Sequence, residues 1–329
     1  MFQIASWQDA FASPVTCALV IAVVVVLLAA AAAIALVSVT GRASPAMRHE
    51  LWLRLGSWLL LLPLMIGPVL AGRAWTIVAV TLLGLLCLKE FSRATGLFRQ
   101  PVVVAMVVIG LLAVNFAALD HWYGFFVAIP SLTICLIAVA TIPQDHPESY
   151  IERTGLGGMA FMLFGSGLAH LGYMANEANY RPILLMLLLC VALNDVLAFT
   201  CGKLIGGPKL LPHTSPGKTV SGAIGALVLM TPLVAYIAHN IFIGTPLDQF
   251  WVLLFLGALV SVAAQAGDLM LSSIKRDLGI KDMGTILPGH GGILDRYNSL
   301  LLVAPAVFHL ITYYHGFGLD QPTRLITGP

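Results

Sequence analysis

The chain has 329 residues, of which 59% are hydrophobic and only 10% are charged, with a formal net charge of +2. Soluble globular domains carry about 25% charged residues, so this composition excludes an ordinary soluble domain and indicates a membrane protein. So small a net charge gives no reason to expect a nucleic-acid partner. The five cysteines show no CxxC pairing, and we therefore predict neither a disulfide framework nor a zinc site.

Ten apolar stretches follow one another along the chain. A transmembrane helix needs about 20 mostly apolar residues, and such stretches occur near residues 15–40, 52–71, 74–88, 101–119, 123–142, 157–175, 182–202, 219–243, 249–271 and 299–315. Because unpaired backbone polar groups are costly in hydrocarbon, we predict an all-α, polytopic transmembrane helix bundle of about ten spans.

The first three stretches need separate comment. The first is too long for a signal-peptide core and has no Lys or Arg before it, so we expect it to be retained as a helix. The second contains Pro63 and Pro68, and the third is short. For these two, a hairpin or a re-entrant segment is an alternative to two full spans.

The basic residues predict an orientation. If each connector from an odd to an even span is cytoplasmic, only Arg73, Arg181 and Arg324 of the 17 basic residues fall on the opposite side. This positive-inside bias predicts that both termini face away from the cytoplasm. We divide the chain into N-terminal transmembrane helices (1–150) and a catalytic transmembrane region (151–329) with cytoplasmic loops 203–219 and 275–298. Small residues in the spans permit close helix packing and leave a homodimer open.

The first long connector combines cations with small residues. It follows Asn194 and Asp195 in the seventh span and includes Lys203 and the segment Ser215-Pro216-Gly217-Lys218-Thr219. Backbone N–H groups and a hydroxyl at a helix start suit a phosphate. A basic loop before an N-capped helix is the structural alternative. Asp195 favours function, because an ionisable residue in an apolar span is costly and usually faces a polar cavity.

The second connector begins within the ninth span. Gln265, Asp268, Ser272 and Lys275 recur at spacings of three and four, which places them on one helical face. Apolar residues surround this stripe, so we expect it to face the bundle interior. A Gly-rich segment follows, comprising Pro288, Gly289, His290, Gly291, Gly292, Ile293, Leu294, Asp295 and Arg296. Its glycines permit the close backbone approach that a phosphate-cradling turn requires.

These segments resemble the CDP-diacylglycerol synthase, or phosphatidate cytidylyltransferase, family. The resemblance rests on Ser273-Ile274-Lys275-Arg276, on Lys281-Asp282 and on residues 288–296, with further similarity at residues 194–195 and 215–219. The chain departs from the family at Tyr297 and Asn298, where an aliphatic residue and Asp are usual. The resemblance implies an enzyme that transfers a cytidylyl group from CTP to phosphatidate, with Asp268 and Asp295 binding a divalent metal.

We expect Mg²⁺ as the metal, because it prefers oxygen ligands and commonly uses one or two carboxylates plus substrate phosphates. The predicted catalytic residues are Asp268, Asp295, Lys275, Arg296 and His290. The predicted substrate-binding residues are Asn194, Asp195, Lys203, Ser215, Lys218, Thr219, Ser272, Arg276, Lys281, Asp282, Gly289, Gly291 and Gly292. His290 is expected either to hydrogen-bond a phosphate or act as an acid, or to hold the turn.

The expected setting is a lipid bilayer, a bacterial inner membrane or its equivalent, with the active site facing the cytoplasmic CTP pool. Two alternatives stay open at this stage. Tyr297 and Asn298 motivate a different acceptor, such as another lipid phosphate or a polyprenol. Asp195 and Asp268 motivate an ion-coupled transporter, although the polar residues gather toward one face, whereas transporter sites usually lie near the bilayer midplane.

Overall fold

The computed structural model describes residues 7–40, 44–286, 291–316 and 324–328. Within these residues, nine helices are long and apolar enough to cross a membrane. They are α2 (Pro14–Val39), α3 (Pro45–Ala71), α4 (Arg73–Thr95), α5 (Pro101–Leu119), α6 (Tyr123–Ala140), the continuous helix formed by α7 (Tyr150–Ala160), η3 (Phe161–Gly167) and α8 (Leu168–Met174), α9 (Tyr180–Ile205), α10 (Val220–Phe242) and α11 (Phe250–Asp277). A tenth, α13 (Leu300–His315), has 16 residues. The predicted all-α, multi-pass membrane bundle is confirmed.

The remaining elements are short. α1 (Trp7–Ala10) precedes α2, and the others lie between the long helices: η1 (Leu97–Arg99), η2 (Ile142–Gln144), β1 (Lys209–Leu211), β2 (Ser215–Thr219) and α12 (Leu294–Tyr297). The two strands form an antiparallel hairpin that pairs Lys209 with Thr219. No pattern in the sequence predicts these strands. In the hairpin, each strand supplies hydrogen-bond partners for the backbone of the other, without a longer sheet.

The two uncertain spans are full helices. α3 has 27 residues and α4 has 23. Gly72, with φ of 141°, separates them, a backbone conformation that only glycine adopts readily. α4 continues to Thr95 instead of ending near residue 88, and Gly96 ends it in the left-handed conformation (φ 79°). The extra turns carry Glu90 into the bundle.

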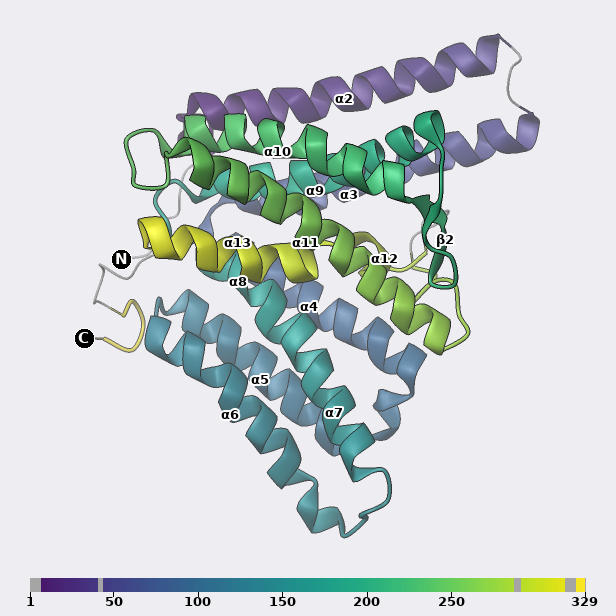
Figure 1. Ribbon diagram of the computed structural model, residues 1–329. Coiled ribbons are helices and arrows are strands. Elements are labelled where there is room, and N and C mark those ends of the chain that lie inside the picture. The colour runs from purple at the N-terminus through teal and green to yellow at the C-terminus, as the bar shows by residue number, and fades with distance from the viewer. Residues whose placement is uncertain (1–6, 41–43, 287–290, 317–323, 329) are drawn as a thin grey trace.

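The helices form three groups around a common core (Figure 1). α2, α3, α9 and α10 lie together on one side, α11 and α13 occupy the middle, and α4 to α8 lie on the other side. Large side chains fill the middle, where Phe91, Phe164 and Phe308 are almost completely buried. The hairpin, α12 and the C-terminal end of α11 meet at one end of the bundle (Figure 1), which we call the loop end.

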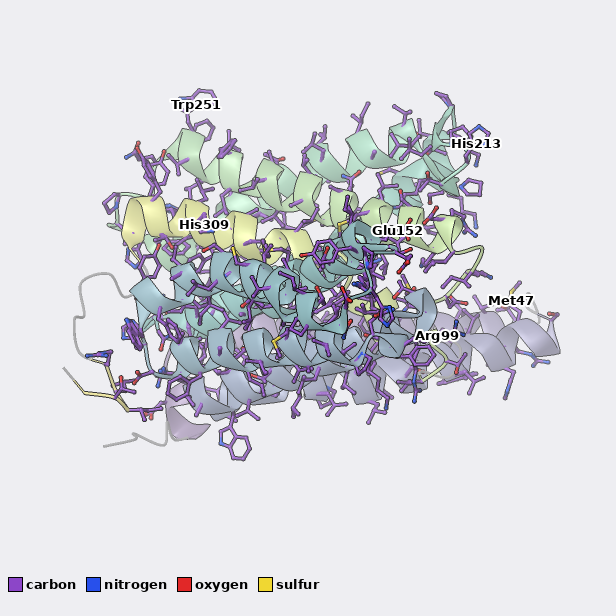
Figure 2. All side chains as sticks on the ribbon, turned by 90° about the horizontal axis from the view of Figure 1, so that it is seen from below. Met47, Arg99, Glu152, His213, Trp251 and His309 are labelled. Carbon is purple, nitrogen blue, oxygen red and sulfur yellow. The ribbon has the colours of Figure 1, made fainter. Side chains whose placement is uncertain are left out.

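The chain alternates between the two ends as the predicted spans require. Met47, Arg99 and His213 lie toward the loop end, whereas Trp251 and His309 lie toward the opposite end (Figure 2). Two basic residues assigned to the other side do lie there: Arg73 donates to Asn176 Oδ1 at 2.5 Å, and the Arg324 guanidinium lies 4.8 Å from the Trp122 ring centre. Which end faces the cytoplasm stays a prediction.

At that opposite end, Asp120 holds a C-terminal segment of the chain. Its Oδ1 accepts from the backbone N–H of Ile326 at 2.6 Å, and its Oδ2 accepts from the Thr327 hydroxyl at 2.6 Å. Burial alone would raise the pKa of Asp120, but these hydrogen bonds and the nearby charge of Arg324 together hold it below its ordinary value. Ionised Asp120 therefore attaches residues 325–327 to the end of α5.

Candidate active site

A polar cavity of about 560 Å³ opens at the loop end, between α9, α10, α11 and the hairpin. Three lysines line it, Lys203, Lys209 and Lys218, together with the carboxylates of Asp195 and Asp268. Thr219 and Gln265 complete its polar lining. The structure thus brings residues from both long connectors into one cavity. An anion with several phosphates matches this excess of cations.

Two glycines allow α9 and α10 to pack closely beside this cavity. A Cβ on Gly202 would lie 2.6 Å from Thr219 Oγ1, and one on Gly222 would overlap the backbone oxygen of Ala198. Thr219 is the N-cap of α10 and accepts a hydrogen bond from Gly222 N at 3.1 Å. The N-capped helix of the structural alternative is present, and its start borders the cavity that contains Lys218.

Asp268 is held between two partners. Asn298 Nδ2 donates to its Oδ1 at 2.6 Å, and Lys218 Nζ forms an ion pair with its Oδ2. Ser299 N donates to Asn298 Oδ1 at 2.7 Å, which fixes the amide with its NH₂ group toward Asp268. Gly267 permits this approach, because a Cβ there would lie 2.7 Å from the Asn298 carbonyl oxygen.

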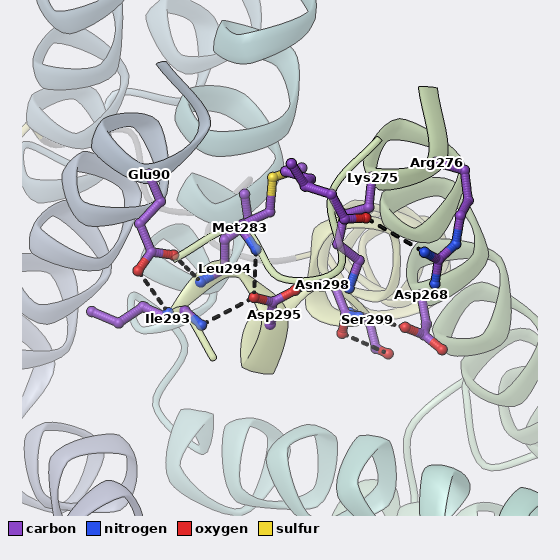
Figure 3. A network of polar contacts seen from close by, with 12 residues as sticks. Glu90, Asp268, Lys275, Arg276, Met283, Ile293, Leu294, Asp295, Asn298 and Ser299 are labelled. Atoms are coloured by element: carbon purple, nitrogen blue, oxygen red, sulfur yellow. Dashed lines mark hydrogen bonds and ion pairs between the residues drawn. The ribbon is translucent and has the colours of Figure 1, made fainter. Parts of the chain in front are cut away.

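Asp295 organises the turn before α12 (Figure 3). Its Oδ1 accepts from Lys275 Nζ at 2.8 Å, and its Oδ2 accepts from the backbone N–H groups of Met283 at 2.8 Å and Gly292 at 3.0 Å. The Asp295 side chain is only 4% exposed. Both of its oxygens are therefore already engaged by donors of the protein.

Glu90 is a site residue that the sequence analysis missed. It reaches from α4 to the same turn, where Ile293 N donates to its Oε1 at 2.9 Å and Leu294 N to its Oε2 at 2.8 Å (Figure 3). Added Cβ atoms on Gly284 or Gly292 would lie 2.5 Å from one or other of these oxygens. A Glu at the end of an apolar run is the available signal, but the predicted third span ends near residue 88, before Glu90.

The structure places the other described residues of the predicted site around Asp268 and Asp295. Asn194 is buried and accepts from Ser261 Oγ at 2.7 Å, and Arg276 donates to the Thr214 carbonyl at 3.3 Å, linking α11 to the hairpin. A Cβ on Gly291 would lie 3.1 Å from an oxygen of both Asp282 and Asp295. Ser215 and Ser272 are half-buried, and Lys281 is exposed. Gly289 and His290 lie outside the described residues.

A second cavity, of about 150 Å³, adjoins the turn on the other side of Asp195. Asp195, Asp295 and Arg296 line one part of it, and Tyr297 and residues of α3 and α9 line the rest. Asp195 borders both this cavity and the polar one. The site therefore has a polar chamber with three lysines and two carboxylates, and a partly apolar chamber, and the two meet at the carboxylate of Asp195.

The residues fit a divalent cation to different degrees. Asp195 and Asp268 face the same cavity and interact electrostatically, so two like charges are held together there. Mg²⁺ commonly takes one or two carboxylates plus substrate phosphates, which this pair can provide. Among the described residues, no three His, Cys, Asp or Glu side chains converge as a ready-made metal cluster. Both oxygens of Asp268 are also engaged, by Asn298 and Lys218, but Asp268 lines the polar cavity. Asp295 does not line that cavity, and Lys275 and two backbone N–H groups occupy its oxygens, so it fits less well.

The fold and these chambers define a multi-pass membrane protein with a cavity lined by lysines and carboxylates at one end of the bundle. The sequence profile of the cytidylyltransferase family matches residues 52–314. The chain belongs to this family, whose members are nucleotidyltransferases, and the transporter alternative has no support.

Individual relatives give the same result. The chain is 32% identical over 240 residues to the phosphatidate cytidylyltransferase of Staphylococcus aureus, covering 72% of this chain and 90% of the relative. It is 37% identical over 175 residues to that of Staphylococcus saprophyticus, covering 52% and 65%. It is also 29% identical over 273 residues to the uncharacterized protein YnbB of Escherichia coli, covering 80% and 88%.

Proposed function

We propose that this protein transfers the cytidylyl group of CTP to phosphatidate and forms CDP-diacylglycerol. The observation that carries the proposal is the junction of two chambers at Asp195. One is lined by three lysines and Asp268, and the other by apolar side chains, Arg296 and Asp295. A nucleoside triphosphate suits the first chamber, and a lipid phosphate suits the second. Relatives named phosphatidate cytidylyltransferase support this choice of substrates.

In the proposed reaction, a phosphate oxygen of phosphatidate attacks the α-phosphorus of CTP. The bond between that phosphorus and the oxygen bridging to the β-phosphate breaks, and pyrophosphate leaves with the electron pair. A phosphomonoester is already ionised near neutral pH, so the protein needs no strong base. Its task is to bring two polyanions together and to stabilise the charge on the leaving group.

We assign that task to the cations around the junction. Lys203, Lys209 and Lys218 bind the triphosphate in the polar cavity, and Arg296 binds the lipid phosphate in the adjoining one. Lys218 is paired with Asp268 in the structure, so the arrival of a triphosphate gives this lysine a competing anionic partner.

We infer that Asp195 and Asp268 hold a Mg²⁺ ion, which would neutralise triphosphate charge and assist departure of pyrophosphate. We further infer that Asp295 acts by positioning the turn, since three protein donors occupy its oxygens. The earlier assignment of Asp295 as a metal ligand makes a different prediction. A higher Mg²⁺ requirement in Asp295→Asn supports ligation, whereas lower kcat at an unchanged Mg²⁺ requirement supports positioning.

We also propose that the loop end faces the cytoplasm of a bacterium, across its inner membrane. Most of the basic residues fall in connectors predicted for that side, and CTP is a cytoplasmic substrate. Cysteine labelling from one side tests this orientation, in a protein whose five native cysteines are replaced. Arg99→Cys lies in the loop-end connector and Asp248→Cys at the opposite end. Labelling of Asp248→Cys alone by an impermeant reagent from outside the cell supports the proposal, and labelling of Arg99→Cys alone contradicts it.

The test of the reaction is a panel of acceptors with purified protein, labelled CTP and either Mg²⁺ or EDTA. Phosphatidate, a polyprenol and a polyprenyl phosphate are offered separately. We expect Mg²⁺-dependent product with phosphatidate. Product with a polyprenol or its phosphate and none with phosphatidate would replace the proposed acceptor, an alternative that Tyr297 motivates because it lines the acceptor chamber.

A further inference from the structure

An apolar cavity continues from the acceptor chamber into the bundle. It has a volume of about 250 Å³ and lies between α2, α3 and α9. It shares five lining residues with the acceptor chamber: Trp58, Met65, Leu188, Ala192 and Val196. The two spaces are therefore neighbours with a common wall, and the acceptor chamber in turn meets the polar cavity at Asp195.

One face of α9 lines all three spaces in succession. The apolar cavity uses residues of α9 between Leu185 and Val196, the acceptor chamber those between Leu188 and Val196, and the polar cavity those between Asp195 and Lys203. Their spacings of three and four residues place them along one side of the helix. A molecule lying along this face would pass from an apolar environment to a charged one.

The apolar part of this face has a definite length. Leu185 and Asp195 are ten residues apart, which corresponds to about 15 Å along a helix. A membrane lipid joins a polar head to apolar acyl chains. The cavity has an apolar lining, and charged groups lie only at its Asp195 end.

We propose that the cavity between α2, α3 and α9 holds an acyl chain of the acceptor lipid phosphate, with the phosphate beside Arg296. This inference rests on the proposed function. Acyl chains are already in apolar surroundings in a bilayer, so the cavity adds little hydrophobic affinity. It acts by alignment, because a chain seated along α9 places its phosphate at the junction with the polar cavity.

α2 forms the outer wall of this cavity. Val23, Leu27 and Ala30 lie on it, at helical spacings of four and three. The match to the cytidylyltransferase family begins at residue 52, so α2 lies outside the matched segment. The proposed acyl-chain site therefore depends on α2 as well as on α9.

The test is photo-cross-linking of full-length protein by phosphatidate that carries a diazirine near the end of one acyl chain. No CTP is added, so labelling does not depend on catalysis. Ala30→Trp places a bulky side chain in the cavity. Ala29→Trp is the matched control, because Ala29 is an exposed residue of the same helix that does not line the cavity.

We expect cross-links at the lining residues of α2 and α9, competition by unlabelled dioleoyl phosphatidate, and about a tenfold loss in Ala30→Trp but not in Ala29→Trp. Equal labelling of all faces of α2, or labelling unchanged by Ala30→Trp, would overturn the acyl-chain site. Selective cross-linking by a protein that transfers no cytidylate would retain this site and refute the proposed reaction. Cytidylyl transfer to phosphatidate together with unselective cross-linking would support the proposed reaction and refute the acyl-chain site.

Discussion

Removal of the Glu90 carboxylate, which α4 contributes, should destabilise the turn before α12 and lower the rate of cytidylyl transfer. Glu90 accepts from two consecutive backbone N–H groups, those of Ile293 and Leu294, and is only 4% exposed. Glu90→Gln keeps the shape of the side chain and one oxygen, but directs an NH₂ group at a second N–H donor. Each buried donor left unsatisfied costs about 1–3 kcal/mol, and hydrogen bonds to a charged group are worth about 1.5–3 kcal/mol.

We therefore expect Glu90→Gln to lose about 2 kcal/mol of the interactions that hold the turn. If this turn must be ordered for reaction, kcat falls by about thirtyfold, since each 1.36 kcal/mol is tenfold in rate. The assay is cytidylyl transfer at saturating CTP and phosphatidate, together with thermal unfolding in detergent. Glu177→Gln is the matched control, because the Glu177 carboxylate lies 3.7 Å from His315 Nε2 at the opposite end of the bundle.

Two results would refute this reasoning. Wild-type kcat in Glu90→Gln would show that the turn needs no anchor in α4. An equal loss in Glu177→Gln would show that loss of any buried or half-buried carboxylate, at either end, has the same effect. Glu90→Asp gives a further check, because a side chain one methylene shorter should bind the two N–H groups less well and give an intermediate rate.

Three further predictions concern stability. Lys275→Met removes the charge that lies 2.8 Å from the Asp295 carboxylate, whose side chain is 4% exposed, and should lower the free energy of unfolding by about 3 kcal/mol. Lys281 is exposed, so Lys281→Met should cost little. Equal urea midpoints for the two variants would contradict this prediction. Gly222→Ala should lower stability by about 1–3 kcal/mol, because the added Cβ would overlap the α9 backbone. Gly217→Ala should not, because nothing lies within 4 Å of a Cβ there. Equal thermal midpoints for the two variants would contradict the close packing of α9 and α10 at Gly222. The pKa of Asp120 is lowered in the folded protein, so its contribution should be complete above its unfolded pKa of about 3.9 and vanish as pH falls through the folded pKa. Thermal midpoints of wild type and Asp120→Asn should therefore converge in acid, and a difference that grows in acid would reverse this sign.

The sequence predicted the number of spans because hydrocarbon imposes a length and a composition on each helix. It also grouped Asp268 and Lys275 on one face of α11 through helical periodicity, and the structure retains that face beside the site. Periodicity relates residues within one helix only. It could not show that Asp268 and Asp295 have separate partners, with Lys218 on the first and Lys275 on the second.

A contact between segments that are far apart in the sequence explains why Glu90 was missed. Glu90 precedes its partners by about 200 residues, so nothing local in the sequence connects α4 with the turn before α12. The β1–β2 hairpin was missed for another reason, because its strands of three and five residues are too short to give an alternating pattern. The apolar cavity beside α2 depends on how three helices pack, which composition does not specify.

The most direct measurement is transfer of labelled cytidylate from CTP to dioleoyl phosphatidate by purified protein in Mg²⁺, comparing wild type with Asp268→Ala and Asp248→Ala. Asp268 lines the polar cavity, whereas Asp248 is paired with His239 at the opposite end of the bundle. We predict labelled CDP-diacylglycerol from wild type and Asp248→Ala, and a loss of at least about a hundredfold in folded Asp268→Ala. Folded wild type that forms no such product, or Asp268→Ala that forms it at the wild-type rate, would contradict the account.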